Sequence, residues 1–126
     1  MRKTHFIRRE DVKGYHPANH EGTTNYRLIS PETVGSRHIE LLLGVMEKDH
    51  GALPHMHPGI EQVCYVLEGT AIAEVGGERK HVGPGDCVFF PADIFHVFTA
   101  TSDEPVKLLV IYSPPYGEDP AKVVKG

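Results

Sequence analysis

The stretch Leu53-Pro54-His55-Met56-His57-Pro58 contains two histidines that are separated by one residue. Side chains two positions apart on an extended chain point to the same face, so both imidazoles can approach one ion. Prolines on either side of the pair restrict the backbone there. Taken alone, such a pair is more typical of two exposed histidines in a loop, so residues elsewhere in the chain decide between the two interpretations.

Two further residues favour a metal site. Gln62 stands five residues after His57, at the start of a strand-like run, and His96 lies in the apolar segment Ile94-Phe95-His96-Val97-Phe98. Three imidazoles and one oxygen ligand suit Fe(II), Mn(II), Ni(II), Co(II) or Zn(II), and they do not suit Mg(II) or Ca(II). We therefore predict that the chain binds one divalent transition metal ion, whose identity stays open.

From residue 38 onward, short strand-like runs alternate with turns rich in glycine, proline and aspartate, and no helical period of useful length appears. Asp49-His50-Gly51 and Gly83-Pro84-Gly85-Asp86 are predicted to be turns. Gly76-Gly77 stands between two strand-like runs, which is typical of a β-hairpin with a two-residue turn. The pattern predicts an all-β sandwich or barrel.

The histidine-bearing segments resemble the two sequence motifs of the cupin superfamily. The residues that match are His55, His57, Gln62 and Gly69 in the first motif, and Gly85, Pro91 and His96 in the second. Asp93 and Ala100 stand where the family has glycine and asparagine, and Asp49 stands where it has glycine. The resemblance covers roughly residues 38 to 112 and implies a small single-domain cupin, which folds as a double-stranded β-helix, or jelly-roll, barrel.

The fourth metal ligand is where the chain departs from most of the family, which carries glutamate there. The spacing to Gly69 places Gln62 in this position, and Glu61 is the alternative if a small bulge presents it. Adjacent strand residues face opposite ways, so only one of the two points inward. A neutral amide leaves the ion its full charge and favours Lewis-acid chemistry on an anionic, chelating substrate. Gln in this position is similar to cupins that open unsaturated uronate rings, although some cupin dioxygenases tolerate it.

The resemblance implies a metal-dependent enzyme that acts on a small oxygenated acid or sugar, with an isomerase or lyase favoured over a dioxygenase. The alternative is a non-catalytic binding or sensing module with a structural metal, because no general base is identifiable and the catalytic residues stay unknown. Alternation along the strands brings Cys64 and Phe98 into the pocket with the ligands. Tyr112 and Arg27 are further candidates for the pocket lining.

The chain has 126 residues, the length of one domain. We expect an N-terminal arm at 1–36 that packs on the barrel or on a partner, the barrel at 37–113 and a tail at 114–126. The net charge of −4 disfavours nucleic acid, and the apolar runs are too short to cross a membrane. The N-terminus lacks a signal-peptide pattern, so we expect a cytoplasmic protein. Family resemblance and sheet edges predict a homodimer that binds a small molecule.

Overall fold

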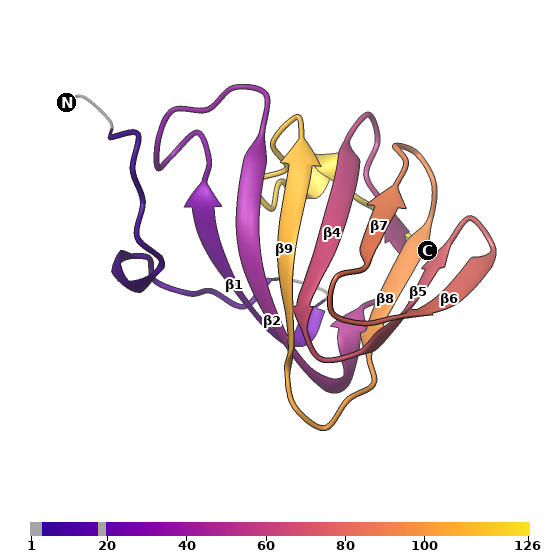
Figure 1. Ribbon diagram of the computed structural model, residues 1–126. Helices are drawn as coiled ribbons and strands as arrows, with labels where there is room; N and C mark the ends of the chain where they lie inside the picture. The colour runs from indigo at the N-terminus through magenta and orange to yellow at the C-terminus, as the bar shows by residue number, and fades with distance from the viewer. Residues whose placement is uncertain (1–3, 18–19) are drawn as a thin grey trace.

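The computed structural model describes residues 4–17 and 20–126, which form a barrel of antiparallel strands (Figure 1). The strands are β1 (His20–Ile29), β2 (Glu40–Ala52), β3 (His55–Met56), β4 (Glu61–Glu68), β5 (Ala71–Val75), β6 (Glu78–Val82), β7 (Cys87–Phe90), β8 (His96–Ala100), β9 (Val106–Ser113) and β10 (Val124–Lys125). Two short 3-10 helices, η1 (Arg9–Asp11) and η2 (Pro120–Lys122), complete the described elements. No helix in the described ranges is long and apolar enough to span a membrane.

The strands follow the order β10-β3-β8-β2-β9-β4-β7, with β1 paired to β2, β5 paired to β8, and β6 paired to β5. In Figure 1 the strands β1, β2, β9, β4 and β7 form the near wall, and β8 and β5 curve away from it. Part of the predicted N-terminal arm is thus a strand of the barrel, because β1 pairs with β2 along most of its length. Part of the tail also joins the sheet, through the pairing of β10 with β3.

The turn predicted at Asp49-His50-Gly51 is wrong, because these residues lie inside β2. The strand bends there instead, and Asp49 has a φ of 63°, a left-handed conformation that a short polar side chain tolerates. A Cβ atom at Gly51 would collide with the carbonyl oxygen of Phe98, so glycine permits the close approach. The bend lets β2 pair with β9 through residues 40–46 and reach β8 at Gly51.

The hairpin predicted at Gly76-Gly77 is confirmed, because these residues connect β5 to β6 and Val75 pairs with Glu78. Their φ angles of 55° and 87° are both positive, as a type I′ turn requires. Glycine adopts this conformation without the steric cost that a side chain imposes.

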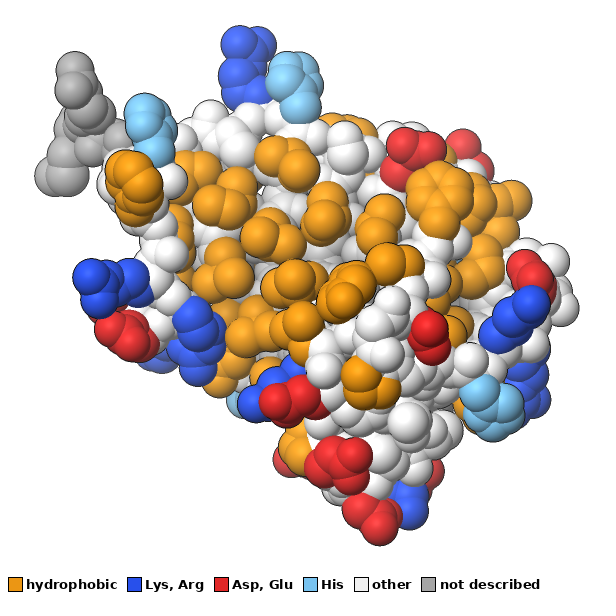
Figure 2. Space-filling model, viewed as in Figure 1, with side chains coloured by type: hydrophobic (Ala, Val, Ile, Leu, Met, Phe, Trp, Pro, Cys, Tyr) orange, Lys and Arg blue, Asp and Glu red, His pale blue; other side chains and the backbone are white. Residues whose placement is uncertain are grey.

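Side chains alternate between the inside and the outside of the barrel along β2, β4 and β9, as a period of two requires. The inward residues form one core, which includes Leu42, Met46, Val66, Phe90, Phe98, Val106 and Leu108. The outward residues of four neighbouring strands are also apolar. They form two rows in register across the wall, Leu41–Ile111–Val63–Phe89 and Leu43–Leu109–Tyr65. Figure 2 shows this wall as a broad apolar surface, which we call the outer apolar face.

Candidate metal centre

Three buried histidines meet at one end of the barrel interior. His55 in β3 and His96 at the start of β8 are direct cross-strand partners, and their ring centroids lie 4.4 Å apart. His57 follows β3 by one residue, and its ring centroid lies 4.9 Å from that of His55. The candidate ligand atoms of the three side chains all lie within 4.8 Å of one another. The two-residue spacing and the distant strand therefore bring together the three imidazoles that the sequence singled out.

Each imidazole faces a backbone carbonyl oxygen with its Nδ1 atom. The distances are 2.6 Å from His55 to Leu53, 3.0 Å from His57 to Lys122, and 3.4 Å from His96 to Ile94. A carbonyl oxygen only accepts hydrogen bonds, so Nδ1 carries the proton and Nε2 keeps its lone pair. This arrangement is typical of histidines that bind a metal through Nε2.

Burial gives these imidazoles the protonation state that metal binding needs. It lowers the pKa of His57 from 6.5 to about 4 and also lowers the pKa of His55. Both rings are therefore neutral at neutral pH, and a neutral imidazole is the form that binds a metal ion. The Nε2 atom of His57 is buried without a hydrogen-bond partner among the described residues. An unpaired buried nitrogen is costly, and a metal ion would satisfy it.

Gln62, the second residue of β4, supplies an oxygen atom to the same interior. Its side chain is buried, whereas Glu61 beside it is exposed. The Nε2 atom of Gln62 donates to Sγ of Cys64 at 3.6 Å, and Oε1 is buried without a hydrogen-bond partner in the part of the chain that the structure describes. Of the two candidates for the fourth ligand, the residue that faces the interior is thus Gln62. Three imidazoles and one amide oxygen fit a divalent transition metal ion.

Asp93 fills the position at which the cupin motif has glycine, and it adopts a glycine-like conformation with a φ of 67°. Its Oδ1 atom accepts a hydrogen bond from the Gly59 backbone at 3.1 Å, and its own N–H donates to the His57 carbonyl at 3.3 Å. Aspartate therefore keeps the left-handed turn and connects it to the loop that carries His57.

The cavity beside the histidines is mostly apolar. It is lined by Thr23, Asn25, Gly44, Met46, His55, Gln62, Cys64, Phe90, His96, Phe98, Leu108, Val110 and Tyr112. Burial raises the pKa of the Cys64 thiol to about 12 and raises the pKa of the Tyr112 phenol, so both stay protonated at neutral pH. The lining includes no carboxylate and no Lys or Arg within the described ranges.

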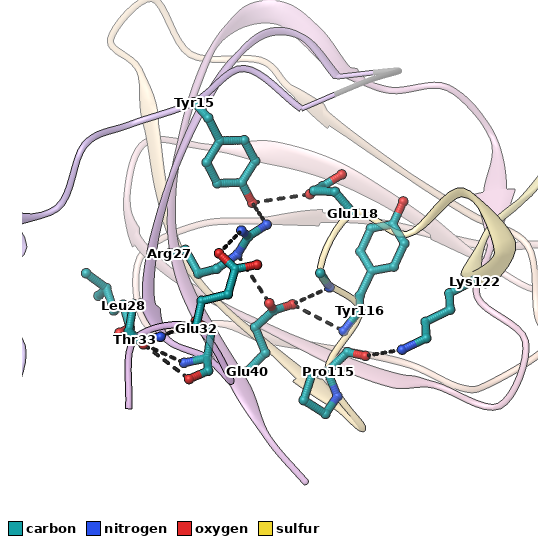
Figure 3. A network of polar contacts seen from close by, with 12 residues as sticks. Tyr15, Arg27, Leu28, Glu32, Thr33, Glu40, Pro115, Tyr116, Glu118 and Lys122 are labelled. Atoms are coloured by element: carbon teal, nitrogen blue, oxygen red, sulfur yellow. Dashed lines mark hydrogen bonds and ion pairs between the residues drawn. The ribbon is translucent and has the colours of Figure 1, made fainter. Parts of the chain in front are cut away.

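Arg27, which sequence reasoning placed among the candidates for the pocket, lies in a separate polar network (Figure 3). Its Nε atom is 3.3 Å from Oε2 of the buried Glu40, and its Nη1 atom is 3.7 Å from the exposed Glu32. Its Nη2 atom donates to the Tyr15 hydroxyl at 3.3 Å, and that hydroxyl donates to Glu118 at the same distance. Arg27 thus compensates the charge of the buried Glu40, and the cavity lining does not include it.

The same network holds the C-terminal segment against the histidines, a role that sequence reasoning missed. Oε1 of Glu40 accepts hydrogen bonds from the backbones of Tyr116, at 3.2 Å, and Gly117, at 3.1 Å. The Tyr116 ring in turn packs on the His57 ring, with centroids 4.4 Å apart. The one available signal was a charged residue, Glu40, at the head of an apolar run.

Comparison with known proteins agrees with this geometry. The sequence profile of the cupin domain matches residues 42–112, more than half of the chain. The protein belongs to the cupin family. The predicted family and the predicted barrel are therefore both confirmed.

Several relatives of this cupin are connected with polyketide synthesis by name. The protein named polyketide synthase CurC from Streptomyces cyaneus is 29% identical over 104 residues, which cover 82% of this chain and 68% of that protein. The polyketide cyclase RemF from Streptomyces resistomycificus has a similar structure, with a TM-score of 0.75 and 26% identity over 89% of this chain and 80% of that one. KdgF from Halomonas sp. has a TM-score of 0.78 over 92% of this chain and 98% of its own, but at 17% identity it shows the fold alone.

Proposed function

We propose that this cupin is a metal-dependent enzyme whose metal ion is held by His55, His57, His96 and Gln62. The observation that carries the proposal is a pair of buried ligand-type atoms, Nε2 of His57 and Oε1 of Gln62, beside two further imidazoles. Neither atom has a hydrogen-bond partner within residues 4–17 and 20–126. Stability alone gives no reason to bury such atoms unpaired. A divalent transition metal ion at this point would satisfy both.

The apolar lining favours a particular substrate class. A sugar carries a hydroxyl on most of its carbons and needs many hydrogen-bond partners, whereas most of the surface that lines this cavity is apolar. A small oxygenated acid or phenolic ketone with an apolar body fits better. The names of the relatives, a polyketide synthase and a polyketide cyclase, support the same class, because polyketides combine carbonyl groups with apolar carbon skeletons.

A bound divalent ion would act as a Lewis acid and polarise a carbonyl or enol oxygen of the substrate. The protein groups around it position the substrate and keep water away. Cys64 and Tyr112 stay protonated at neutral pH, so neither serves as a base there. With no carboxylate in the described lining, the site suits substrates whose C–H or O–H group is already acidic, such as 1,3-dicarbonyl compounds. Isomerisation and lyase chemistry therefore rank above oxygen chemistry.

A second candidate is a binding or sensing module in which the metal captures a chelating ligand without converting it. The absence of a carboxylate base from the described cavity lining is the observation that favours it. The two candidates share the metal centre and differ in turnover alone.

Elemental analysis of the purified protein tests the proposal, with the His55→Ala/His57→Ala variant as its control. We expect about one transition metal per chain in the wild type and none in the variant. The metal-loaded protein is then incubated with phenolic ketones and dicarbonyl acids, and products are followed by mass spectrometry. Metal-dependent conversion supports the enzyme, and binding without conversion supports the sensing module. A chain that takes up no metal after reconstitution with each candidate ion contradicts both.

A further inference from the structure

The cavity contains a second polar position on the wall formed by β1. Thr23 is buried, with 3% of its surface exposed, and its side chain lines the cavity. Its Oγ1 atom is buried and has no hydrogen-bond partner among the described residues. A hydroxyl that is buried without a hydrogen bond costs stability. It therefore marks a position where a polar ligand atom could form that hydrogen bond.

Asn25 lies two residues further along β1, on the same face, and it also lines the cavity with only 6% exposure. Its cross-strand partner is Gly44, where a Cβ atom would lie 3.1 Å from Oδ1 of Asn25. The missing side chain at Gly44 therefore leaves room for the amide. Backbone hydrogen bonds in both directions between Asn25 and Tyr15, at 2.8 and 2.9 Å, hold this part of β1 in place.

Apolar residues surround these two side chains within the cavity. The lining holds Met46, which is the cross-strand partner of Thr23, together with Phe90, Phe98, Leu108 and Val110. The polar groups of the lining are the histidines with Gln62, the Cys64 thiol, the Tyr112 hydroxyl and the β1 pair. A ligand that reaches both the histidines and the β1 pair carries two oxygen functions on an apolar body.

We propose that Thr23 and Asn25 form a second anchor for the ligand and bind a hydroxyl or carbonyl oxygen while another oxygen of the same ligand lies at the metal centre. This inference rests on the proposed metal-dependent function. Thr23 donates or accepts through its hydroxyl, and Asn25 contributes its amide. The metal ion would recognise the chelating group of the ligand. Thr23 and Asn25 would recognise a second polar group on its apolar body.

Two small chelators that differ by one hydroxyl group test the anchor. Kojic acid carries a hydroxymethyl group on the pyranone ring, and allomaltol carries a methyl group there, while both chelate a metal through the same hydroxyketone. The protein is loaded with Co(II), whose visible absorption reports first metal uptake and then chelation. We expect wild type to bind kojic acid about tenfold more tightly than allomaltol, as one buried hydrogen bond would give.

The Thr23→Val variant keeps the shape of the side chain and removes the hydroxyl, so we expect it to lose the preference for kojic acid and keep its affinity for allomaltol. The Thr23→Ser variant keeps the hydroxyl and retains the preference. The anchor is contradicted if wild type binds the two chelators equally well, or if the preference survives in Thr23→Val. Neither result contradicts the proposed metal centre. Absence of the Co(II) spectrum in wild type overturns the metal centre and the anchor with it.

Discussion

The Nδ1 atom of His57 lies 3.0 Å from the carbonyl oxygen of Lys122, a residue 65 positions further along the chain. This contact makes the C-terminal segment part of the support of the candidate metal centre. The hydrogen bond fixes which nitrogen of His57 carries the proton and therefore which one is available to a metal. Strand β10 continues the support, because Lys125 pairs with His55.

Removal of residues 120–126 is expected to weaken metal binding by about 10- to 100-fold, the usual effect of losing the partner of a metal-bound histidine. Isothermal titration of the metal-free protein measures this. A gentler variant is Asp119→Ala, which removes the side chain that caps η2 through the Ala121 backbone. Substitution of the exposed Lys125 by alanine is the control. Unchanged affinity in the shortened chain would show that the tail does not orient His57.

Substitutions at two neighbouring positions separate the candidates for the fourth ligand. Gln62→Leu removes the buried oxygen and should lower metal affinity by about tenfold or more. Gln62→Glu should raise the affinity, because a carboxylate adds negative charge beside the ion. Glu61→Gln should change nothing, since Glu61 is exposed. Metal retained after dialysis against a chelator is the measurement, and the opposite ranking of the two positions would assign the ligand to Glu61.

The metal-free protein should lose stability as the pH falls below 6.5. The pKa of His57 is 6.5 when the ring is free and about 4 when it is buried in the fold, so the unfolded chain binds more protons between these values. The free energy of unfolding therefore rises with pH across that window and levels off above it. Urea midpoints at a series of pH values measure this slope. His57→Gln should reduce the slope and leave the smaller part that comes from His55, whose pKa burial also lowers, whereas substitution of the exposed His81 should not change it.

Arg27→Ala should destabilise the protein by about 3 kcal/mol or more, because it leaves the buried carboxylate of Glu40 without its ion-pair partner. Glu32→Gln removes the exposed partner of the same guanidinium and should cost less than about 1 kcal/mol. Chemical denaturation of the two variants gives both values. Similar costs for the two substitutions would contradict the account of Arg27 as the partner of a buried charge.

The outer apolar face predicts a homodimer in which two copies pack face to face. Its two rows contain no charged residue, and a two-fold axis would place the same apolar rows of a second copy against them. Sedimentation should give twice the chain mass of 14.0 kDa. Phe89→Glu on the face should produce monomers, whereas Phe95→Glu, at an exposed position outside the two rows, should not. A monomeric wild type would rule this pairing out.

The histidines could be identified from sequence because their placement depends on local rules. The side-chain period of two along an extended chain places His55 and His57 on the same face. The spacing of the two motifs then identifies Gln62 and His96 as the other candidate ligands. Thr23 escaped notice because nothing local distinguishes it from Thr24. Its burial depends on the register of β1 against β2, which the polar sequence around it does not specify.

The position of Arg27 illustrates a second limit. A lone arginine in a short strand is compatible with a pocket or with a buried ion pair. Its partner Glu40 lies 13 positions away on β2, and Glu118 lies at the other end of the chain. The bend of β2 at Asp49 was missed for a related reason, because a left-handed aspartate gives the same local signal inside a strand as in a turn.

The direct pairing of His55 with His96 joins residues 41 positions apart, and His57 adds a contact to the end of the chain. No short segment of the chain contains all the ligands, so the unfolded chain offers no comparable site. A metal ion that binds the native barrel would then shift the folding equilibrium by mass action, and its binding energy would become folding energy. Because distant strands must pair before the ligands converge, the ion would bind after the slow, long-range step of folding and would act on the rate of unfolding.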